Sequence, residues 1–187
     1  DVERVVCLGR ASVGQSHPKL VDLVHKDLFD LSSLEGQLTG FDGCLFCLGV
    51  SSAGMAEPEY TRVAYDLTLS VAKTLARLNP AMTFIYVTGA GTDSTERGRV
   101  MWARVKGRTE NELLKLPFKA AYMFRPAGIQ PLHGIRSKTP LYQAFYSASG
   151  PLLGLAARHL PSLMTTTEQL VKAMLRVVRE GAPSRIL

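Results

Sequence analysis

The chain alternates short apolar runs with segments of helical periodicity, and this alternation limits it to few folds. The clearest unit begins with the apolar residues 83–87, continues through the polar loop 88–94 and an expected helix over about 99–116, and ends in a second apolar run at 120–124. A five-residue apolar run between turns predicts a buried strand, and a strand–helix–strand unit predicts two parallel strands. We therefore expect an α/β protein with a parallel sheet covered by helices on both faces.

The rest of the chain extends the same pattern. Three further strands are expected at 5–8, 19–24 and 44–48. A short helix is expected at 32–38. Apolar residues recur with a helical period over 57–78, and Asn79-Pro80 ends that helix. Thr165 and Glu168 have the spacing of a capping box for a last helix that ends at Gly181.

Size and composition indicate one ordinary globular domain. The 187 residues are 46% apolar and 20% charged, which suits a single domain over 1–187 with a sizeable core. The less regular stretch 131–164 is expected to be a substrate-side segment. No apolar run reaches 18 residues and Asp1-Val2-Glu3-Arg4 does not resemble a signal peptide, so no membrane association is predicted.

The net charge of +6 suggests anionic partners, although the basic residues are scattered. The densest basic group consists of Arg97, Arg99, Arg104, Lys106 and Arg108. Such a group either lines an anionic cofactor or solvates a helix. Nucleic-acid binding is disfavoured, because no aromatic residues are interleaved with the charges.

The three cysteines, Cys7, Cys44 and Cys47, form an odd set within apolar runs, which predicts reduced thiols and a cytoplasmic protein. Cys44 and Cys47 have the spacing of a redox motif. Residues three apart on a strand point to opposite faces, however, so two buried strand cysteines are the favoured interpretation. No metal site is predicted.

The helix after the strand at 83–87 carries the most informative residues. Trp102 and Lys106 are four positions apart and therefore share one helix face, while Thr88 leaves the strand next to them. This layout resembles that of short-chain dehydrogenase/reductases, in which a Ser or Thr precedes Tyr-x-x-x-Lys. The resemblance implies catalytic positions for Thr88, Trp102 and Lys106, but Trp102 replaces the tyrosine that donates the proton.

Further segments resemble the same family in the same order. Gly9-Arg10 ends the strand where dinucleotide folds discriminate their cofactor, and the Arg fork suits the 2′-phosphate, so the expected cofactor is NADP (NADPH) rather than NAD. The cofactor-binding residues that the resemblance implies are Arg10, Asp27, Leu28, Leu48, Gly49, Val50, Lys106, Pro126, Ala127, Gly128 and Ile129. Within the family, residues 46–49, 63–66 and 105–110 are similar to the atypical NAD(P)H-binding proteins related to the Tat-interacting protein.

Each of these residues also has a structural interpretation. Arg10 on its own would be a surface arginine, Asp27 would cap a turn, and Thr88 would bond its own backbone. Lys106 would pair with Glu110 on a solvated helix face. Trp102 suits a core position as well as the wall of a pocket.

A Rossmann-type site also needs a glycine-rich turn after its first strand, and the sequence has none before Arg10. Gly89-Ala90-Gly91 is a poor match. In the strand order 3-2-1-4-5-6, 5–8 would be the second strand and 44–48 the fourth. We therefore expect the central strand and its turn to lie in roughly 20–30 residues before Asp1, with 5–8 and 44–48 not directly paired. The alternative is a divergent fold that begins at Asp1.

Three functions follow from the resemblance. The first is an NADPH-dependent oxidoreductase with an altered motif, which acts on an unidentified small molecule. The loss of a positioned general acid typically removes ~10²–10⁴ in rate, unless Tyr86, Tyr122, Tyr142 or a water replaces it. The second is a catalytically weak NADPH-binding regulatory module with a homodimeric or other protein partner. The third is an enzyme similar to sugar-nucleotide epimerases, which also needs the tyrosine.

Overall fold

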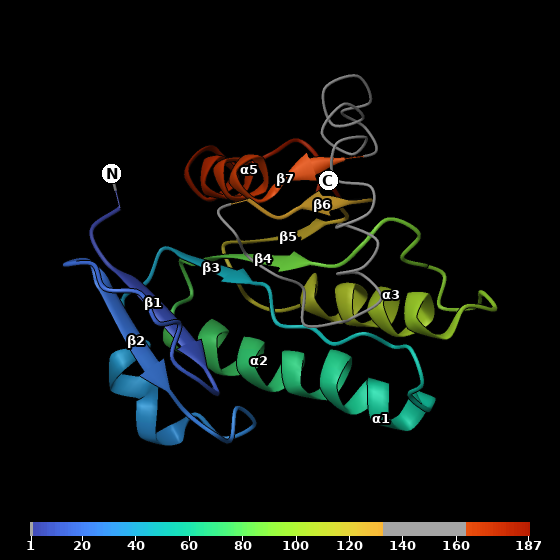
Figure 1. The fold of residues 1–187 in the computed structure, drawn as a ribbon, viewed down its shortest axis with the longest axis horizontal. Coiled ribbons are helices and arrows are strands. Elements are labelled where there is room, and N and C mark those ends of the chain that lie inside the picture. The colour runs from blue at the N-terminus through green and yellow to red at the C-terminus, as the bar shows by residue number, and fades with distance from the viewer. Residues whose placement is uncertain (1, 133–163) are drawn as a thin grey trace.

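The computed structural model describes residues 2–132 and 164–187, and Figure 1 shows their arrangement. The strands are β1 (Val5–Gly9), β2 (Leu20–Val24), β3 (Gly43–Phe46), β4 (Thr83–Val87), β5 (Ala120–Phe124), β6 (Ile129–Gln130) and β7 (Thr165–Thr166). The helices are the 3-10 helix η1 (Ser32–Gln37), α1 (Glu57–Thr61), the π-helical turn η2 (Arg62–Leu67), α2 (Thr68–Leu78), α3 (Met101–Leu113) and α5 (Thr167–Glu180). α1, η2 and α2 follow one another without a break, which confirms the long helix expected over 57–78.

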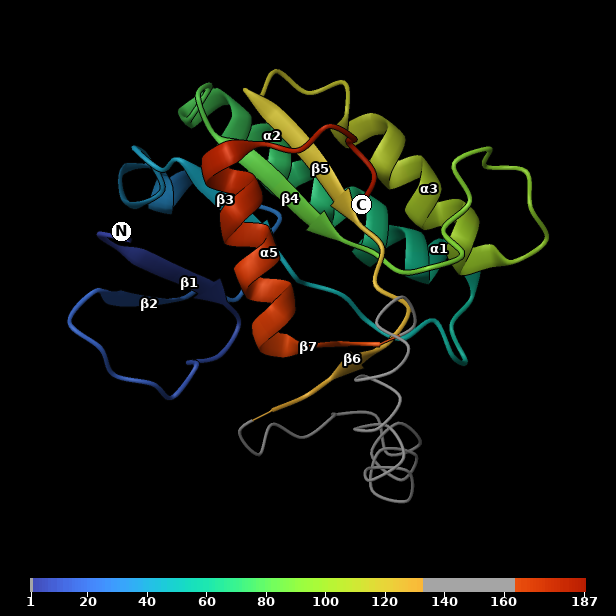
Figure 2. The same ribbon diagram turned by 90° about the horizontal axis from the view of Figure 1, so that it is seen from above.

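All strand pairs between the named strands are parallel. β1 pairs with β2, and β3, β4 and β5 form a three-stranded sheet in that order. Within the described residues no backbone hydrogen bond joins β1 to β3, which confirms that these two segments are not directly paired. The arrowheads of β1, β3 and β4 point to the same side in Figures 1 and 2, so their carboxyl ends share one edge of the molecule.

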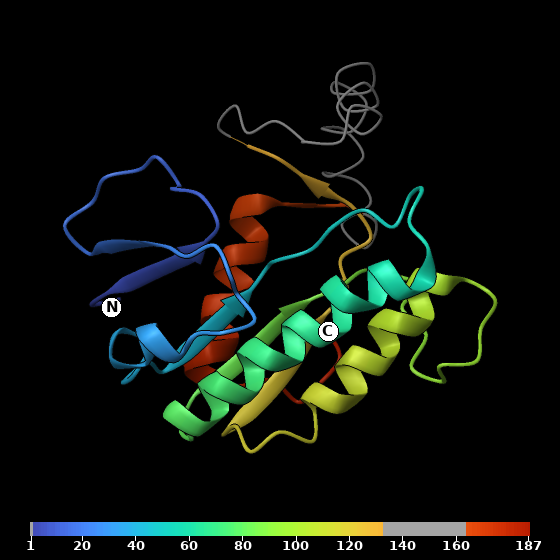
Figure 3. The same ribbon diagram turned by 90° about the horizontal axis from the view of Figure 1, so that it is seen from below.

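The central strand β4 alternates between two hydrophobic cores, as a strand with two covered faces must. Phe84 and Tyr86 are buried in the cluster that includes α2, whereas Ile85 is buried against α5 on the opposite face. Figures 2 and 3 show α2 and α3 on one side of the sheet and α5 on the other. Burying each such large side chain contributes about 1.5–3 kcal/mol. The expected doubly wound, Rossmann-type α/β/α fold class is confirmed.

Two details of the sequence-based prediction are wrong. The capping box at the start of α5 is formed by Thr166 and Gln169, one residue later than predicted, because the short parallel ladder with β6 extends through Thr166 and the helix begins only at Thr167. Cys47 lies beyond the end of β3 and is exposed, so the cysteines are not both buried strand residues.

Most of the predicted substrate-side segment 131–164 lies outside the described residues, as does Tyr142. Within the described part of the chain, no helix is both long and apolar enough to cross a membrane.

Candidate functional site

The loops that follow β4 and β5 run side by side at the carboxyl edge of the sheet. The Thr88 N–H donates to the Phe124 carbonyl at 2.8 Å, and the Ala90 N–H donates to the Pro126 carbonyl at 3.0 Å. These bonds prolong the β4–β5 ladder beyond the strands and bring residues 88–90 alongside residues 124–126. Thr88 and the segment 126–129, both predicted to contribute to the site, therefore start at adjacent strand ends.

Helix α3 carries Trp102 and Lys106 along the same edge. Trp102 is half-buried and packs on the cluster of Tyr60, Ala64 and Val105. Its ring tip lies 3.6 Å from the position that a Cβ on Gly91 would occupy. Trp102 therefore belongs to a small core and also touches the loop after β4, so both of its expected roles have a structural basis.

Lys106 is partly buried, with its Nζ atom 5.6 Å from the centre of the Tyr86 ring. Burial lowers the pKa of Lys106 below its usual value, and the negative charge of Glu110 opposes this shift. A cation over an aromatic face at this distance is attracted by the ring quadrupole. The Tyr86 ring therefore stabilises the charged amine of Lys106.

A buried ion pair ties α3 to β5, and the sequence did not predict it. Glu110 is 1% exposed, and both of its carboxylate oxygens accept hydrogen bonds from Arg125. Thr88 Oγ1 donates to Glu110 Oε1 at 2.6 Å, and Arg125 Nη2 donates to Ser94 Oγ at 2.5 Å. Glu110 is therefore not on a solvated face, and its ion-pair partner is Arg125 rather than Lys106.

The signal for this pair is visible in hindsight on the helix face. Ala103, Gly107 and Leu113 are buried at helical spacing, and Glu110 falls on the same face. An acid within a buried stripe requires a partner, because an unpaired buried charge costs far more than it contributes. The sequence does not say which of the many basic residues supplies the partner.

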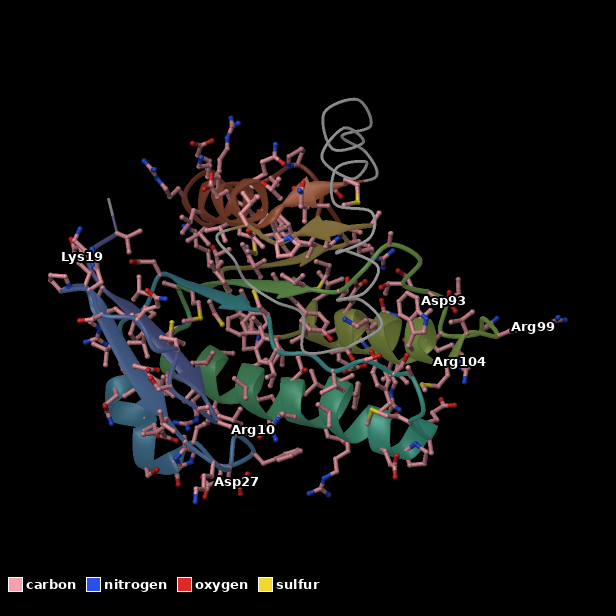
Figure 4. The ribbon with its side chains drawn as sticks, in the orientation of Figure 1. Arg10, Lys19, Asp27, Asp93, Arg99 and Arg104 are labelled. Atoms are coloured by element: carbon pink, nitrogen blue, oxygen red, sulfur yellow. The ribbon has the colours of Figure 1, made fainter. Side chains whose placement is uncertain are left out.

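The loop 88–98 is fixed to α3 by a second set of contacts. The Asp93 N–H donates to the Ala103 carbonyl at 3.1 Å. The Asp93 carboxylate accepts from the Thr95 hydroxyl at 2.6 Å and from the Gly98 N–H at 2.6 Å, and these bonds hold the pKa of Asp93 below its usual value. Figure 4 shows Asp93 beside the start of α3, near Arg104, which donates to the Gly98 carbonyl at 2.9 Å.

The predicted adenosine-side residues lie at the ends of β1 and β2. Arg10 directly follows β1, is exposed, and makes no ion pair with residues 2–132 or 164–187. The His25 N–H donates to the Gly9 carbonyl at 2.8 Å, so the chain segments that carry Arg10 and Asp27 leave neighbouring strand ends, and Figure 4 shows both residues at that end of the strands. Asp27 accepts a hydrogen bond from the Phe29 N–H at 2.9 Å, which supports its turn-capping role. Leu28 is 6% exposed in the main core and offers little side-chain surface to a ligand.

The remaining predicted residues follow β3 and β5. Leu48, Gly49 and Val50 follow β3 and are exposed. The 126–129 segment leaves β5, and Ile129 pairs with Thr165. The sites after β1, β2, β3, β4 and β5 thus form a row along one edge.

The residues present fit both ends of a dinucleotide. The exposed Arg10 guanidinium suits a phosphate, and the Lys106 ammonium suits ribose hydroxyls. The turn Gly89-Ala90-Gly91 does not suit a pyrophosphate, because the Ala90 and Thr92 N–H groups already donate to the Pro126 and Gly89 carbonyls. Its glycines serve the loop rather than a phosphate.

Neither described tyrosine considered as a replacement proton donor is well placed. Tyr86 is 1% exposed and donates to the Ala64 carbonyl, and burial raises the pKa of its phenol. The Tyr122 hydroxyl accepts from the Ala182 N–H beyond α5, on the opposite face of the sheet. Burial also raises the pKa of the Cys44 thiol, to about 12, which disfavours redox chemistry there.

Two open cavities lie away from Lys106. One of about 590 Å³ lies between β5 and the end of α5 and is lined by Tyr122, Arg176 and Glu180. The other, of about 290 Å³, lies between α1 and α3 and is lined by Glu57, Arg104 and Arg108. The candidate site is instead the open edge along the strand ends. Residues 2–132 and 164–187 contain no group of three or more His, Cys, Asp or Glu side chains able to hold a metal ion.

Comparison with known proteins defines the fold. No family model matches the sequence. A relative in Purpureocillium lilacinum, the leucinostatins biosynthesis cluster protein T, is 26% identical over 142 residues, which cover 73% of this chain and 52% of the relative.

Several solved structures share the architecture at low sequence identity. DesIV, the dTDP-glucose 4,6-dehydratase of Streptomyces venezuelae solved with NAD and TYD, is 14% identical with a TM-score of 0.67, covering 100% of this chain and 66% of its own. RMD of Pseudomonas aeruginosa with NADPH is 14% identical with a TM-score of 0.63, and the match covers 93% of this chain and 68% of the RMD chain. WbmH of Bordetella bronchiseptica with NAD+ is 15% identical with a TM-score of 0.64, and the match covers 95% of this chain and 64% of the WbmH chain.

The chain therefore has the fold of the short-chain dehydrogenase/reductase class, and it spans about half of the fungal relative and about two thirds of these structures. The resemblance predicted from the sequence is confirmed at this level. The narrower similarity to the Tat-interacting-protein-related group stays a prediction.

Proposed function

We propose that this chain provides most of an NADPH site and that the protein is an oxidoreductase of the short-chain dehydrogenase/reductase type with an altered catalytic motif. The observation that carries the proposal is the row of residues at the carboxyl edge of the strands. It begins with the exposed Arg10 after β1 and reaches Thr88 after β4, with the partly buried Lys106 on α3 beside it. Ligands of open parallel sheets bind at this edge.

Cofactor complexes of the similar structures support dinucleotide binding. WbmH and DesIV were solved with NAD+ or NAD, and RMD with NADPH. We carry over dinucleotide binding from these proteins, and Arg10 favours the phosphorylated form. A forked guanidinium forms paired, charge-assisted bonds to a phosphate.

The chain's own residues have distinct tasks in this proposal. Lys106 holds the ribose next to the nicotinamide, which supplies hydride chemistry when bound. Thr88 contacts the reacting oxygen of the substrate. Trp102 stands where the family has its proton donor, and an indole N–H is not a usable acid near neutral pH. Slow turnover is the consequence.

A regulatory NADPH-binding module is the second candidate, and the half-buried Trp102 favours it. An indole packed into a small core stabilises the site without providing acid catalysis. An epimerase-like activity is a weaker candidate. WbmG was solved with NAD and UDP, but epimerisation in this family would need the missing tyrosine. A cytoplasmic location, a homodimer and a protein partner stay predictions.

Replacing Arg10 with Asp should reverse or abolish the preference for NADPH over NADH. Charged hydrogen bonds are worth about 1.5–3 kcal/mol, which corresponds to a roughly 10- to 150-fold weaker NADPH affinity. Isothermal calorimetry of the full-length protein measures both cofactors. Arg179→Asp, an equal charge change on an exposed residue of α5, is the matched control. Equal affinity of the unmodified protein for NADH and NADPH would refute the assignment of Arg10.

Lys106→Ala should weaken NADPH binding about tenfold or more, because one charge-assisted contact is lost. In the unmodified protein, affinity should also fall at alkaline pH. The attraction needs the charged amine, and burial lowers the pKa of Lys106, so the loss should have its midpoint below the usual value for lysine. Titrations across pH 7–11 check this, and Lys115→Ala, on an exposed pair with Glu112, should leave affinity unchanged. A flat profile would remove Lys106 from the site.

A further inference from the structure

Thr88 faces two acceptors inside the protein. Its Oγ1 lies 2.6 Å from Glu110 Oε1 and 3.2 Å from the Phe124 carbonyl oxygen. A hydroxyl has one hydrogen and two lone pairs. Whichever of the two oxygens receives that hydrogen, it points inward, and lone pairs are what remain for a ligand.

This inward orientation of the Thr88 hydrogen depends on the ionised state of Glu110. A protonated carboxyl would reverse it by donating to Thr88. Arg125 prevents this, because Nε and Nη2 both donate to the carboxylate and Glu110 is 1% exposed. Both carboxylate oxygens therefore accept hydrogen bonds from the guanidinium, and the hydrogen between Oγ1 and Oε1 comes from Thr88. Ser94 completes the arrangement by accepting from Arg125 at 2.5 Å.

We propose that the Glu110–Arg125 pair makes Thr88 an obligatory hydrogen-bond acceptor, so that the site selects a hydroxyl group rather than a carbonyl oxygen. The proposal rests on the proposed function, in which Thr88 contacts the substrate. A carbonyl oxygen only accepts, so it would meet the Thr88 lone pairs without a hydrogen between them. A hydroxyl donates to Thr88 and still accepts from a neighbouring donor.

The other polar groups expected at this site are hydrogen-bond donors, which complements the acceptor role of Thr88. The Trp102 indole and the charged Lys106 amine are donors without acceptor capacity. A hydroxyl oxygen between these donors and Thr88 satisfies all of them. In this site Glu110 is a positioning residue, since it acts on the ligand only through Thr88.

The test compares an alcohol with its ketone. Cyclohexanol and cyclohexanone are titrated into the full-length protein and followed by ligand-detected NMR, without nucleotide and at saturating NADPH, with the ketone signal monitored for consumption. The alcohol should bind roughly 10- to 100-fold more tightly, the range expected for a hydrogen bond to a charged network. Calorimetry with NADPH alone tests the proposed function separately, because the alcohol preference can hold even where the dinucleotide does not bind.

Two variants test the cause of the preference. Thr88→Val removes the hydroxyl at nearly constant volume, so alcohol affinity should fall to that of the ketone while ketone affinity stays the same. In Glu110→Gln, Arg125 claims the amide oxygen, and the amide N–H₂ then donates to Thr88. The Phe124 carbonyl, 3.2 Å from Thr88 Oγ1, is then the internal acceptor that remains for the Thr88 hydrogen. This weaker contact lets the hydrogen turn to a ligand more easily, so the preference for the alcohol should shrink. Circular dichroism and melting curves check that both variants fold.

Three results would overturn the proposal. The first is a ketone that binds the unmodified protein as tightly as the alcohol. The second is a preference that survives in Thr88→Val, which is sufficient even where Glu110→Gln does not fold. The third is an absence of binding by either compound, because Thr88 would then present no accessible acceptor.

Discussion

Replacing Gly107 with Ala is expected to be among the most damaging single changes in this chain. A Cβ at this position would lie 1.8 Å from the Asp93 carbonyl oxygen and 2.5 Å from its carbon, both of which are backbone atoms. The helix and the loop would have to separate, which would break the Asp93–Ala103 bond. Overpacking of this kind costs about 3 kcal/mol or more, a large part of a typical stability of about 5–15 kcal/mol.

Thermal melting of the two proteins would show this as a fall in Tm of roughly 6–12 °C or as failure to fold. The control is Gly36→Ala in η1, where a Cβ meets nothing within 4 Å and φ is not positive. That variant should melt within a degree or two of the unmodified protein. A Gly107→Ala protein with an unchanged Tm would show that the loop does not rest on α3.

Trp102→Tyr should produce the largest gain in activity. It places a phenol four residues before Lys106, where the family has its proton donor. General acid catalysis typically contributes ~10²–10⁴ in rate, so NADPH oxidation with a panel of generic carbonyl substrates should rise from very weak towards that range. The smaller ring also leaves a gap in the cluster with Tyr60 and Val105, so a lower Tm is expected.

Trp102→Phe is the matched control, since it creates a similar gap without a hydroxyl. If Trp102→Phe gained as much activity as Trp102→Tyr, the effect would come from pocket size rather than proton transfer. Strong reductase activity in the unmodified protein, undiminished by Lys106→Ala, would place the chemistry elsewhere.

The sequence predicted the fold because its signals are local. The β4 run and the periodicity of α3 each depend on residues within one element, and parallel pairing follows from their alternation. The position of Thr88 and Lys106 at the sheet edge followed in turn. The error at the capping box arose because the ladder between β6 and β7 extends through Thr166, a pairing that helix spacing does not reveal.

The Glu110–Arg125 pair could not be predicted in the same way. An acid four residues after a lysine on a helix normally indicates an exposed pair. Its burial depends on how α3 rests on β5, which is a tertiary fact. Arg125 in turn directly precedes the predicted cofactor-binding residues 126–129, and no spacing rule links its side chain to Glu110.

The anchoring of the loop after β4 has a consequence for how such a site changes over evolution. Residues 89–98 are bonded to α3 and to the segment after β5 through backbone groups and polar side chains. A substitution in this loop therefore disturbs the framework before it alters ligand preference. Apart from Thr88, variation in specificity must enter through parts of the protein that are not built into this framework, and a library aimed at new substrates should leave 89–98 constant.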